Sequence, residues 1–340
     1  MNTMQALVAY AVGEPAEVLR LERRPVPEPG RGQVRIRVQA APVNPNDLHV
    51  LRGRYGFAPH LPAVLGQESV GVLDALGEGV DGFTIGQRVI TIGVTGTWQE
   101  YVVADAGRVL AVPGEMSAST AAQLLTNPLT AVLLVTSELD VQPGEWLLQT
   151  AAGSSVGKVV LQLGRHLGFK TINVIRRRSA VGEILTLGGT EVICTEDEDL
   201  PTRVAEIAGD EGGVRKAIDC VAGQVGADVS RSLAPGGEMI VYGALSTHRQ
   251  TDPDKLTIPL FARSVIYGTK IVRGFWLNRW FATTPQQQIG AALATTFGLV
   301  ASGTIQIVEG QPQKLEQFAE AVRLAEAPAH GGKPLFTFGD

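Results

Sequence analysis

A loop of small residues near the middle of the chain has the composition of a phosphate-binding loop. It covers residues 151–157, behind an apolar segment that predicts a strand (146–150) and before a segment, 156–167, whose apolar residues recur at helical spacing. A helix that begins behind such a loop suits a pyrophosphate, because its first N–H groups point at the ligand. The alternative is an ordinary tight turn of an α/β protein. The residues expected to contact the pyrophosphate are Gly153, Ser154, Ser155, Val156 and Gly157.

Three consecutive arginines follow the next predicted strand, 171–175. Arg176 stands about 20 positions after the glycines of the loop, where an acidic residue would bind the ribose 2′-OH of NAD and a basic one accommodates the 2′-phosphate of NADP. The forked guanidinium groups of Arg176 and Arg178 suit a phosphate. We therefore predict NADPH as the cofactor and hydride transfer as the chemistry, against the alternative of a solvent-facing run of charge.

The predicted elements change character along the chain. Up to about residue 125, short strand candidates are separated by Gly and Pro clusters, which is typical of a compact, mostly β domain. Beyond that point strands and helices alternate, which predicts a doubly wound parallel sheet, and 334–338 predicts a closing strand. We expect an α/β protein with two domains: a β-rich domain from residues 1–125 and 271–340, and a nucleotide-binding domain from residues 126–270.

The composition narrows the classes of partner. The 340 residues carry a net charge of −5, which argues against binding to nucleic acid or to a membrane surface. No apolar run reaches the roughly 20 residues of a membrane-spanning helix, and the first residues lack the pattern of a signal or organelle-targeting peptide. The two cysteines, Cys194 and Cys220, lie in apolar strand-like segments and suggest small buried side chains. A cytoplasmic location is therefore expected.

Several motifs together resemble the medium-chain dehydrogenase/reductase superfamily, and the resemblance covers essentially the whole chain. These motifs are Asn44-Pro45-Asn46-Asp47, Leu61-Pro62-Ala63-Val64-Leu65-Gly66-Gln67-Glu68, Ala151-Ala152 with Val156-Gly157, and Asp219-Cys220-Val221. The resemblance implies a GroES-like, β-rich catalytic domain and a Rossmann domain with a doubly wound parallel sheet.

The residues at the family's zinc positions differ from those of the zinc alcohol dehydrogenases. Those enzymes carry a Cys where this chain has Asn44 and a His where it has Gln67. Zinc needs three or four grouped N, S or O ligands, and the remaining Asp47 and Glu68 do not supply them. The histidines show no such grouping; they are His49, His60, His166, His248 and His330. We therefore expect a zinc-free member without a bound metal.

Two zinc-free branches of the superfamily compete. One contains quinone oxidoreductases and zeta-crystallin, and the other contains the 2-enoyl thioester reductases of mitochondrial and bacterial fatty-acid synthesis. The second branch is more similar in its motifs. Those motifs are here Gly53-Arg54-Tyr55-Gly56, Gly96-Thr97-Trp98, Asn127-Pro128-Leu129-Thr130-Ala131, Arg176 with Arg178, and Gly274-Phe275-Trp276-Leu277 with Trp280. Arg177 departs from the pattern, because the branch often has an acidic residue between its two arginines.

The resemblance to enoyl reductases implies roles for individual side chains. Tyr55 would donate the proton to the α-carbon of the substrate, and Asn44 would hydrogen-bond the nicotinamide ribose or the substrate oxygen. Trp276 would line the acyl slot, although an aromatic residue there also suits a dimer interface. By themselves, Tyr55 could be a loop residue and Asn44 the start of an Asx-turn. The other cofactor contacts that the resemblance implies are Asn127, Thr130, Tyr242, Gly243, Phe275, Leu277 and Lys333.

The activity expected from this resemblance is NADPH-dependent reduction of the C=C bond of a 2-enoyl thioester, carried by CoA or by acyl-carrier protein. Reduction of quinones by NADPH is the alternative enzyme function. Binding of NADPH without turnover, as in a lens crystallin, is the alternative outside enzymes. We also expect a homodimer without a nucleic-acid or membrane partner.

Overall fold

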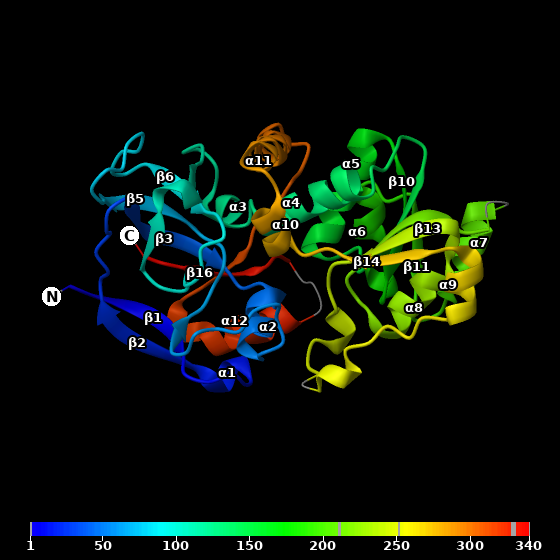
Figure 1. Cartoon of the computed structure of the whole chain (residues 1–340), viewed down its shortest axis with the longest axis horizontal. Coiled ribbons are helices and arrows are strands. Elements are labelled where there is room, and N and C mark those ends of the chain that lie inside the picture. The colour runs from blue at the N-terminus through cyan, green and yellow to red at the C-terminus, as the bar shows by residue number, and fades with distance from the viewer. Residues whose placement is uncertain (1, 210–211, 251, 328–330, 340) are drawn as a thin grey trace. The chain divides into compact units, whose positions relative to one another are not determined.

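The chain folds into two compact units. The computed structural model describes residues 2–209, 212–250, 252–327 and 331–339. One unit consists of residues 1–125 and 307–340, and the other consists of residues 126–306 (Figure 1). Strands dominate the first unit, while strands alternate with helices in the second, so the predicted α/β class is confirmed.

The first unit is built mainly from antiparallel strands. One sheet has the strand order β2-β1-β4, and the other has the order β15-β16-β3-β5-β6-β8, with β7 also paired to β3. Alternate residues of β3 are buried, which directs Val34, Ile36 and Val38 into the core, as period-2 geometry requires. The strands are β1 (Thr3–Ala9), β2 (Leu19–Pro25), β3 (Gln33–Pro42), β4 (Ala63–Val64), β5 (Val70–Leu76), β6 (Arg88–Thr91), β7 (Tyr101–Asp105), β8 (Val109–Ala111), β15 (Gln311–Gln313) and β16 (Pro334–Thr337).

Short helices cover the sheets of this unit. Their bounds are α1 (Pro15–Val18), α2 (Pro45–Leu51), α3 (Ala118–Ala122) and α12 (Phe318–Glu326). The core between sheets and helices contains Trp98, which is fully buried, packs edge-on against Phe336 of β16 and donates its indole N–H to the Pro42 carbonyl at 3.1 Å. The predicted closing strand is therefore confirmed as β16, which pairs with β3.

The second unit contains a parallel sheet with the strand order β11-β10-β9-β12-β13-β14. Successive strands run outward from β9 in both directions, so the topology reverses beside β9, where open α/β sheets bind their ligands. The strands are β9 (Trp146–Thr150), β10 (Lys170–Ile175), β11 (Glu191–Cys194), β12 (Val214–Asp219), β13 (Leu233–Val241) and β14 (Ile271–Gly274).

Helices pack against this parallel sheet, and the chain passes through them between successive strands (Figure 1). The core of this sheet includes Leu148 of β9, Ile172 of β10 and Val229 of α8, all of which are fully buried. Helices cover both faces of a parallel sheet, so its strands are rich in leucine and β-branched residues. The helices are α4 (Thr126–Leu133), α5 (Ser155–Leu167), α6 (Val181–Thr186), α7 (Leu200–Ala208), α8 (Gly223–Arg231), α9 (Ala262–Gly268), α10 (Leu277–Thr283) and α11 (Gln286–Ala301).

The second boundary between the units differs from the one we predicted. We expected residues 271–340 in the β-rich domain, but this unit regains the chain only at residue 307. The reason is that β14 pairs with β13 in register, Glu238 opposite Ile271, and so extends the parallel sheet. The helix α11 also contacts α4 of the same unit. Residues 271–306 therefore belong to the nucleotide-binding unit.

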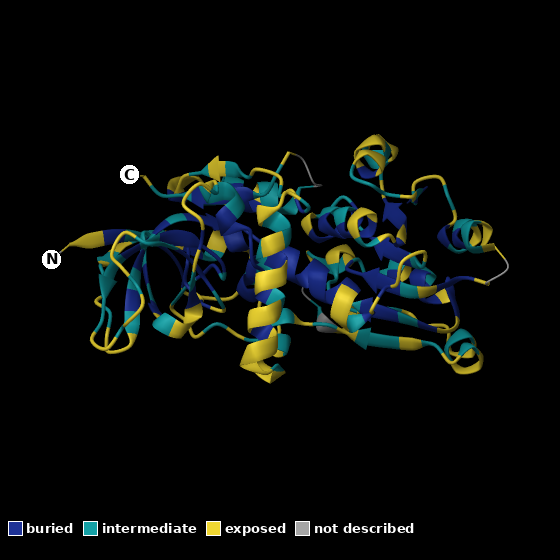
Figure 2. Cartoon of the chain, turned by 90° about the horizontal axis from the view of Figure 1, so that it is seen from above, coloured by how far each residue is buried: buried dark blue, intermediate teal, exposed yellow. Residues whose placement is uncertain are grey.

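Burial follows the same division into strands and outer helices. In Figure 2 dark blue gathers on strands inside both units, such as β3 and β9, whereas yellow marks outward-facing turns of the helices. Among the residues that the structure describes, no helix is both long enough and apolar enough to cross a lipid bilayer.

Candidate active site

The loop between β9 and α5 has a backbone shape that suits a phosphate. Ser154 is the N-cap of α5, and its hydroxyl oxygen accepts a hydrogen bond from the Gly157 N–H at 3.1 Å. A Cβ on Gly157 would lie 2.5 Å from the carbonyl oxygen of Ala152, so the close approach of helix and loop requires glycine. A Cβ on Gly153 would meet nothing within 4 Å. The N-terminus of α5 therefore opens onto a loop without bulky side chains.

Most of the predicted cofactor contacts lie at one edge of the parallel sheet. Carboxyl ends of parallel strands share an edge, so residues that follow β9, β10, β13 and β14 lie along that edge. The residues concerned are Gly153, Ser154, Ser155, Val156 and Gly157 after β9, Arg176 and Arg178 after β10, Tyr242 and Gly243 after β13, and Phe275, Trp276 and Leu277 after β14.

Asp219 ends β12 and joins the loops at this edge. Its Oδ1 accepts hydrogen bonds from the Thr150 hydroxyl at 2.6 Å and from the Val221 N–H at 2.9 Å. Its Oδ2 accepts a hydrogen bond from the Ala222 N–H at 2.9 Å. Burial raises the pKa of the Asp219 carboxyl, and these hydrogen bonds oppose the rise. Because Asp219 ends β12 and bonds Thr150 at the end of β9, it ties the ends of these two neighbouring strands together.

Tyr242 places a buried hydroxyl behind the glycine loop. Among the described residues, none makes a hydrogen bond of good geometry with this hydroxyl, although the Cys220 thiol and the Ser154 hydroxyl are neighbours. Burial raises the pKa of Tyr242 well above its ordinary value and raises the pKa of Cys220 to about 12. Both groups therefore stay protonated at neutral pH, and Cys220 is a small buried side chain, as predicted. Gly243 lies against Cys220, because a Cβ built on Gly243 would be 3.0 Å from the Cβ of Cys220.

Asn127 and Thr130 lie on α4 of the same unit. The Thr130 side chain is buried, and the Asn127 Nδ2 is a buried donor without a hydrogen-bond partner in the described part of the chain. Buried polar atoms without partners are costly and mark sites where a ligand completes the hydrogen bonding. The Asn127 amide, the Tyr242 hydroxyl and the open N-terminus of α5 together fit a dinucleotide.

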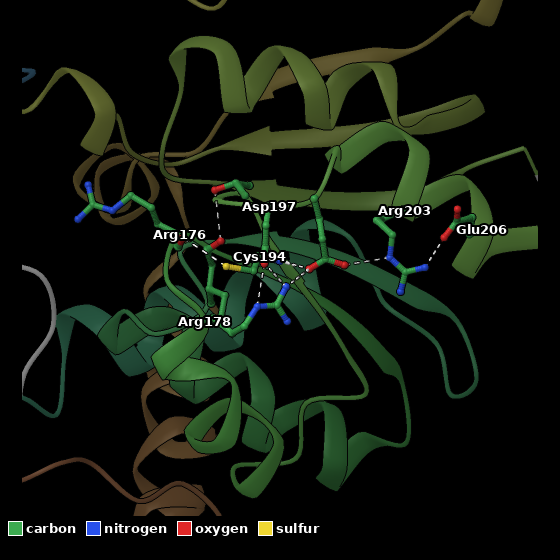
Figure 3. Close-up of polar contacts among 9 residues, drawn as sticks. Arg176, Arg178, Cys194, Asp197, Arg203 and Glu206 are labelled. Carbon is green, nitrogen blue, oxygen red and sulfur yellow. Dashed lines mark hydrogen bonds and ion pairs between the residues drawn. The ribbon is translucent and has the colours of Figure 1, made fainter.

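The arginines after β10 differ in their surroundings (Figure 3). The Arg178 Nε donates a hydrogen bond to Asp197 Oδ2 at 2.9 Å, and its Nη2 donates to the same oxygen. This contact with Asp197 raises the pKa of the Arg178 guanidinium, which is charged in any case. The Arg176 side chain is exposed, points away from Asp197 and makes no hydrogen bond or ion pair with the described residues.

The aromatic segment after β14 continues the sheet edge. The Phe275 N–H donates to the Val241 carbonyl at 2.9 Å, which carries the pairing of β14 with β13 one residue further. Trp276 is the N-cap residue of α10, and its side chain is 36% exposed, while Phe275 and Leu277 are half-buried. These three residues therefore stand at the end of β14 with their backbone fixed by the sheet.

In the first unit, Asn44 is the centre of a buried polar cluster. Its Nδ2 donates to Glu68 Oε2 at 3.1 Å, and its Oδ1 accepts a hydrogen bond from the Lys333 amine. Its backbone N–H donates to Asp47 Oδ2 at 2.9 Å, which makes Asn44 the N-cap of α2. Asp47 Oδ1 accepts from the Gln67 amide at 3.2 Å. The cluster thus fixes which way the Asn44 amide points.

Charges in this cluster are held away from water. Burial raises the pKa of Asp47 to about 7, with hydrogen bonds from Asn44 and Gln67 opposing the rise. Burial also lowers the pKa of Lys333, while the charges of Glu68 and Asp47 oppose that change. A buried amine beside two buried carboxyls is a coupled set that shares its protons. The Glu68 Oε1 further accepts the Leu125 N–H at 3.1 Å, so the cluster is anchored on several segments.

Tyr55 lies in the loop that follows α2. Its ring is half-buried and meets the Phe57 ring edge-on, with 5.1 Å between the ring centroids. The helix before it is fixed by Arg52, whose Nε and Nη2 donate to the two carboxylate oxygens of Glu14 at 3.1 and 2.9 Å. Arg52 also pairs with Glu326 of α12. These contacts of Arg52 hold the end of α2, directly before the loop that carries Tyr55.

Comparisons with known proteins place these two units in one family. Residues 30–114 match the model of the alcohol dehydrogenase GroES-like domain, and residues 155–297 match the zinc-binding dehydrogenase model. The mitochondrial enoyl-[acyl-carrier-protein] reductase of Homo sapiens is 30% identical over 98% of this chain and 88% of its own length. The chain belongs to the medium-chain dehydrogenase/reductase superfamily.

Two solved structures are similar to this chain along almost the whole length of both proteins. The quinone oxidoreductase of Pseudomonas syringae is 26% identical, with a TM-score of 0.88 over 98% of this chain and 99% of the other. A mycobacterial protein solved as a complex with NADPH is also 26% identical, with a TM-score of 0.86 and the same coverage of both chains. The predicted GroES-like and Rossmann units are thereby confirmed.

This medium-chain dehydrogenase/reductase has no grouping of three metal-ligating side chains among its described residues. At the positions that we compared with zinc ligands, the Asn44 amide bonds Glu68 and Lys333, and the Gln67 amide bonds Asp47. His330 lies outside the described residues. The Asn44 amide is thus already bonded to an amine and a carboxylate of the chain itself.

The structure groups the predicted residues of this superfamily member into two sets. Asn44 and Lys333 bond each other in the first unit although they are 289 positions apart, and Tyr55 belongs to the same unit. All the other predicted contacts lie in the second unit. Sequence reasoning missed the partner roles of Asp197 and Asp219, because each depends on which strands lie side by side. Asp219 of β12 bonds Thr150 of β9, and Asp197 after β11 bonds Arg178 after β10. The motif at Asp219 was a signal, but Asp197 had none.

Proposed function

We propose that the chain is an NADPH-dependent oxidoreductase that reduces the C=C bond of 2-enoyl thioesters. The observation that carries the proposal is the similarity to an enoyl-[acyl-carrier-protein] reductase over 98% of the chain, in which Tyr55 keeps the Gly-x-Tyr-Gly context of that branch. The hydrogen-bonded cluster around Asn44 is compatible with it, because the reduction needs a hydride, a proton donor and hydrogen bonds.

The second unit would hold the cofactor through contacts that the chain already positions. The N-terminus of α5 and Ser154 would bind the pyrophosphate, and Arg176 with Arg178 would bind the 2′-phosphate. The Asn127 amide and the Tyr242 hydroxyl are buried polar atoms that a ligand could satisfy. Thr130, Gly243 and the backbone of 275–277 would complete the nicotinamide end. Bound NADPH supplies the hydride that adds to the β-carbon of the substrate.

The first unit would supply the proton and orient polar groups. We assign proton donation to the α-carbon to the Tyr55 hydroxyl. The Asn44 amide, oriented by Glu68 and Lys333, would donate or accept a hydrogen bond at the ribose or at the thioester oxygen, where negative charge develops during the reaction. Trp276 would line the acyl slot.

Quinone reduction is the second candidate function, and the whole-length similarity to a quinone oxidoreductase favours it. An assay of NADPH oxidation by the purified protein distinguishes the two. Turnover with crotonyl-CoA or a longer enoyl-CoA, or with the same acyl groups on acyl-carrier protein, is the expected result. Turnover with benzoquinones and with no enoyl thioester of any chain length would replace the proposal by the quinone function. NADPH binding without any turnover would favour a non-enzymatic role.

The edge of the parallel sheet suits a second copy of the chain. The side chains of Ile266, Tyr267 and Ile271 are 64%, 79% and 49% exposed, and β14 ends the strand order of the sheet. Exposed apolar residues beside an unpaired strand edge favour association through that edge. We propose a homodimer formed through β14 and α9.

We also propose that the enzyme works in fatty-acid metabolism in the cytoplasm.

A further inference from the structure

The two arginines that would bind the 2′-phosphate are not equivalent, which matters if the chain uses NADPH as proposed above. Asp197 Oδ2 accepts two donors, Nε and Nη2, from one edge of the Arg178 guanidinium. Its Nη1 has no partner among the described residues. The Arg176 side chain is exposed, and none of its N–H groups bonds another of the described residues. Figure 3 shows the two side chains extending in different directions from the end of β10.

The turn that carries Asp197 is fixed against the arginine segment. The Cys194 thiol donates to the Arg176 carbonyl at 3.4 Å, and the Thr195 N–H donates to the Ile175 carbonyl at 2.9 Å. Glu198 Oε2 accepts the Cys194 N–H at 2.8 Å, while its Oε1 accepts from Arg203 at 3.0 Å. Asp197 is therefore presented to Arg178 by a tethered turn rather than by a loose loop.

We propose that Asp197 is a specificity-determining residue that weakens binding of the 2′-phosphate by occupying the side-on two-donor edge of Arg178, formed by Nε and Nη2. A phosphate binds arginine best through two parallel N–H groups, and that edge of Arg178 is already taken by a carboxylate. The phosphate must either use the other two-donor edge, formed by Nη1 and Nη2, where Glu198 Oε2 lies 3.8 Å from Nη2, or displace Asp197. Arg176, which pairs with no acid among the described residues, would then supply most of the discrimination between NADPH and NADH.

The magnitude of the effect follows from exposure. The Arg178 and Asp197 side chains are 62% and 49% exposed, so solvent screens their attraction and the pair can be displaced. Removing the carboxylate should tighten binding of a 2′-phosphate by roughly two- to tenfold. A ligand without that phosphate should bind with unchanged affinity.

The experiment uses isothermal titration of the full chain with two probes, 2′,5′-ADP and 5′-AMP. Asp197→Ala should bind 2′,5′-ADP about two- to tenfold more tightly than the wild type and bind 5′-AMP equally well. Glu206→Ala is the matched control, because Glu206 forms a similarly exposed ion pair with Arg203 and touches neither arginine of the site. Circular dichroism of each variant checks that it is folded.

The double variant tests the route of the effect. If Asp197 acts by occupying Arg178, the gain from Asp197→Ala should disappear in an Arg178→Ala background. An equal gain in that background, an unchanged affinity for 2′,5′-ADP or a weaker one would each overturn the proposal. Failure of the wild type to bind 2′,5′-ADP or NADPH would instead overturn the assignment of the cofactor, and this proposal with it.

Discussion

Tyr55 is the residue whose chemistry can be isolated most cleanly. Its ring meets Phe57 edge-on at 5.1 Å, a contact that phenylalanine at position 55 would keep. Tyr55→Phe therefore removes the hydroxyl alone. We expect kcat for crotonyl-CoA to fall by about 10²-fold or more, as for loss of a general acid, with the Kd for NADPH changed by less than about twofold. Steady-state kinetics and fluorescence titration measure the two quantities, and an unchanged kcat would remove Tyr55 from the mechanism.

Asp47 shows how burial of one carboxyl couples stability to pH. Its pKa is raised to about 7 in the folded protein, whereas an exposed aspartate has a pKa near 3.8. The folded state therefore binds more protons than the unfolded state between these values, so the free energy of unfolding falls as pH rises from about 4 to about 7. Each unit by which the folded and unfolded pKa values of Asp47 differ corresponds to roughly 1.4 kcal/mol of unfolding free energy.

Asp47→Asn tests that coupling. The amide cannot ionise, so the decrease of Tm between pH 4 and pH 8 should be smaller in the variant than in the wild type. Scanning calorimetry over this pH range is the measurement. Asp81→Asn, which alters an exposed carboxyl of the same unit, is the control and should leave the slope as it is. Identical slopes for Asp47→Asn and the wild type would show that the buried carboxyl does not titrate in this window.

At the scale of elements, the junction of β9 and α5 depends on one glycine of the loop and not on the other. A Cβ on Gly157 would lie 2.5 Å from the backbone oxygen of Ala152, and backbone cannot move aside cheaply. We expect Gly157→Ala to lower the free energy of unfolding by roughly 1–3 kcal/mol and to weaken NADPH binding, because the N-terminus of α5 is displaced.

The matched control for that junction is Gly153→Ala. No atom lies within 4 Å of a Cβ at position 153, and its backbone is not in the left-handed region. Thermal unfolding of Gly153→Ala should therefore match the wild type. Equal destabilisation of both variants would mean that the loop tolerates no added carbon anywhere, rather than a specific close approach at Gly157.

At the scale of the whole molecule, the proposed homodimer depends on the edge of the parallel sheet. Ile271→Asp would place a charge on β14, where a second copy would bury it, so we expect light scattering after size-exclusion chromatography to report a dimer for the wild type and a monomer for the variant. Ile85 is exposed to 59% in the first unit, and Ile85→Asp should remain dimeric. A monomeric wild type at micromolar concentration would exclude the dimer.

Local pattern was sufficient where neighbours in sequence determine the structure. The loop 151–157 and the helix behind it were predicted from small residues and helical spacing, and α5 begins at Ser155 with the Ser154 cap. The strand β9 was likewise predicted at 146–150, with the bounds that it has. These features depend on residues within one turn or one strand, whose preferences act before any tertiary contact forms.

The chain's amino-acid pattern by itself therefore determined the α/β class, the dinucleotide loop and the arginines behind it, because period, turn chemistry and residue type act over short distances. Only the tertiary structure decided that residues 271–306 extend the parallel sheet, that Lys333 bonds Asn44, and that Asp197 occupies Arg178. Each of these contacts joins segments that no local preference brings together. They follow from strand pairing and burial, which the folded chain satisfies as a whole.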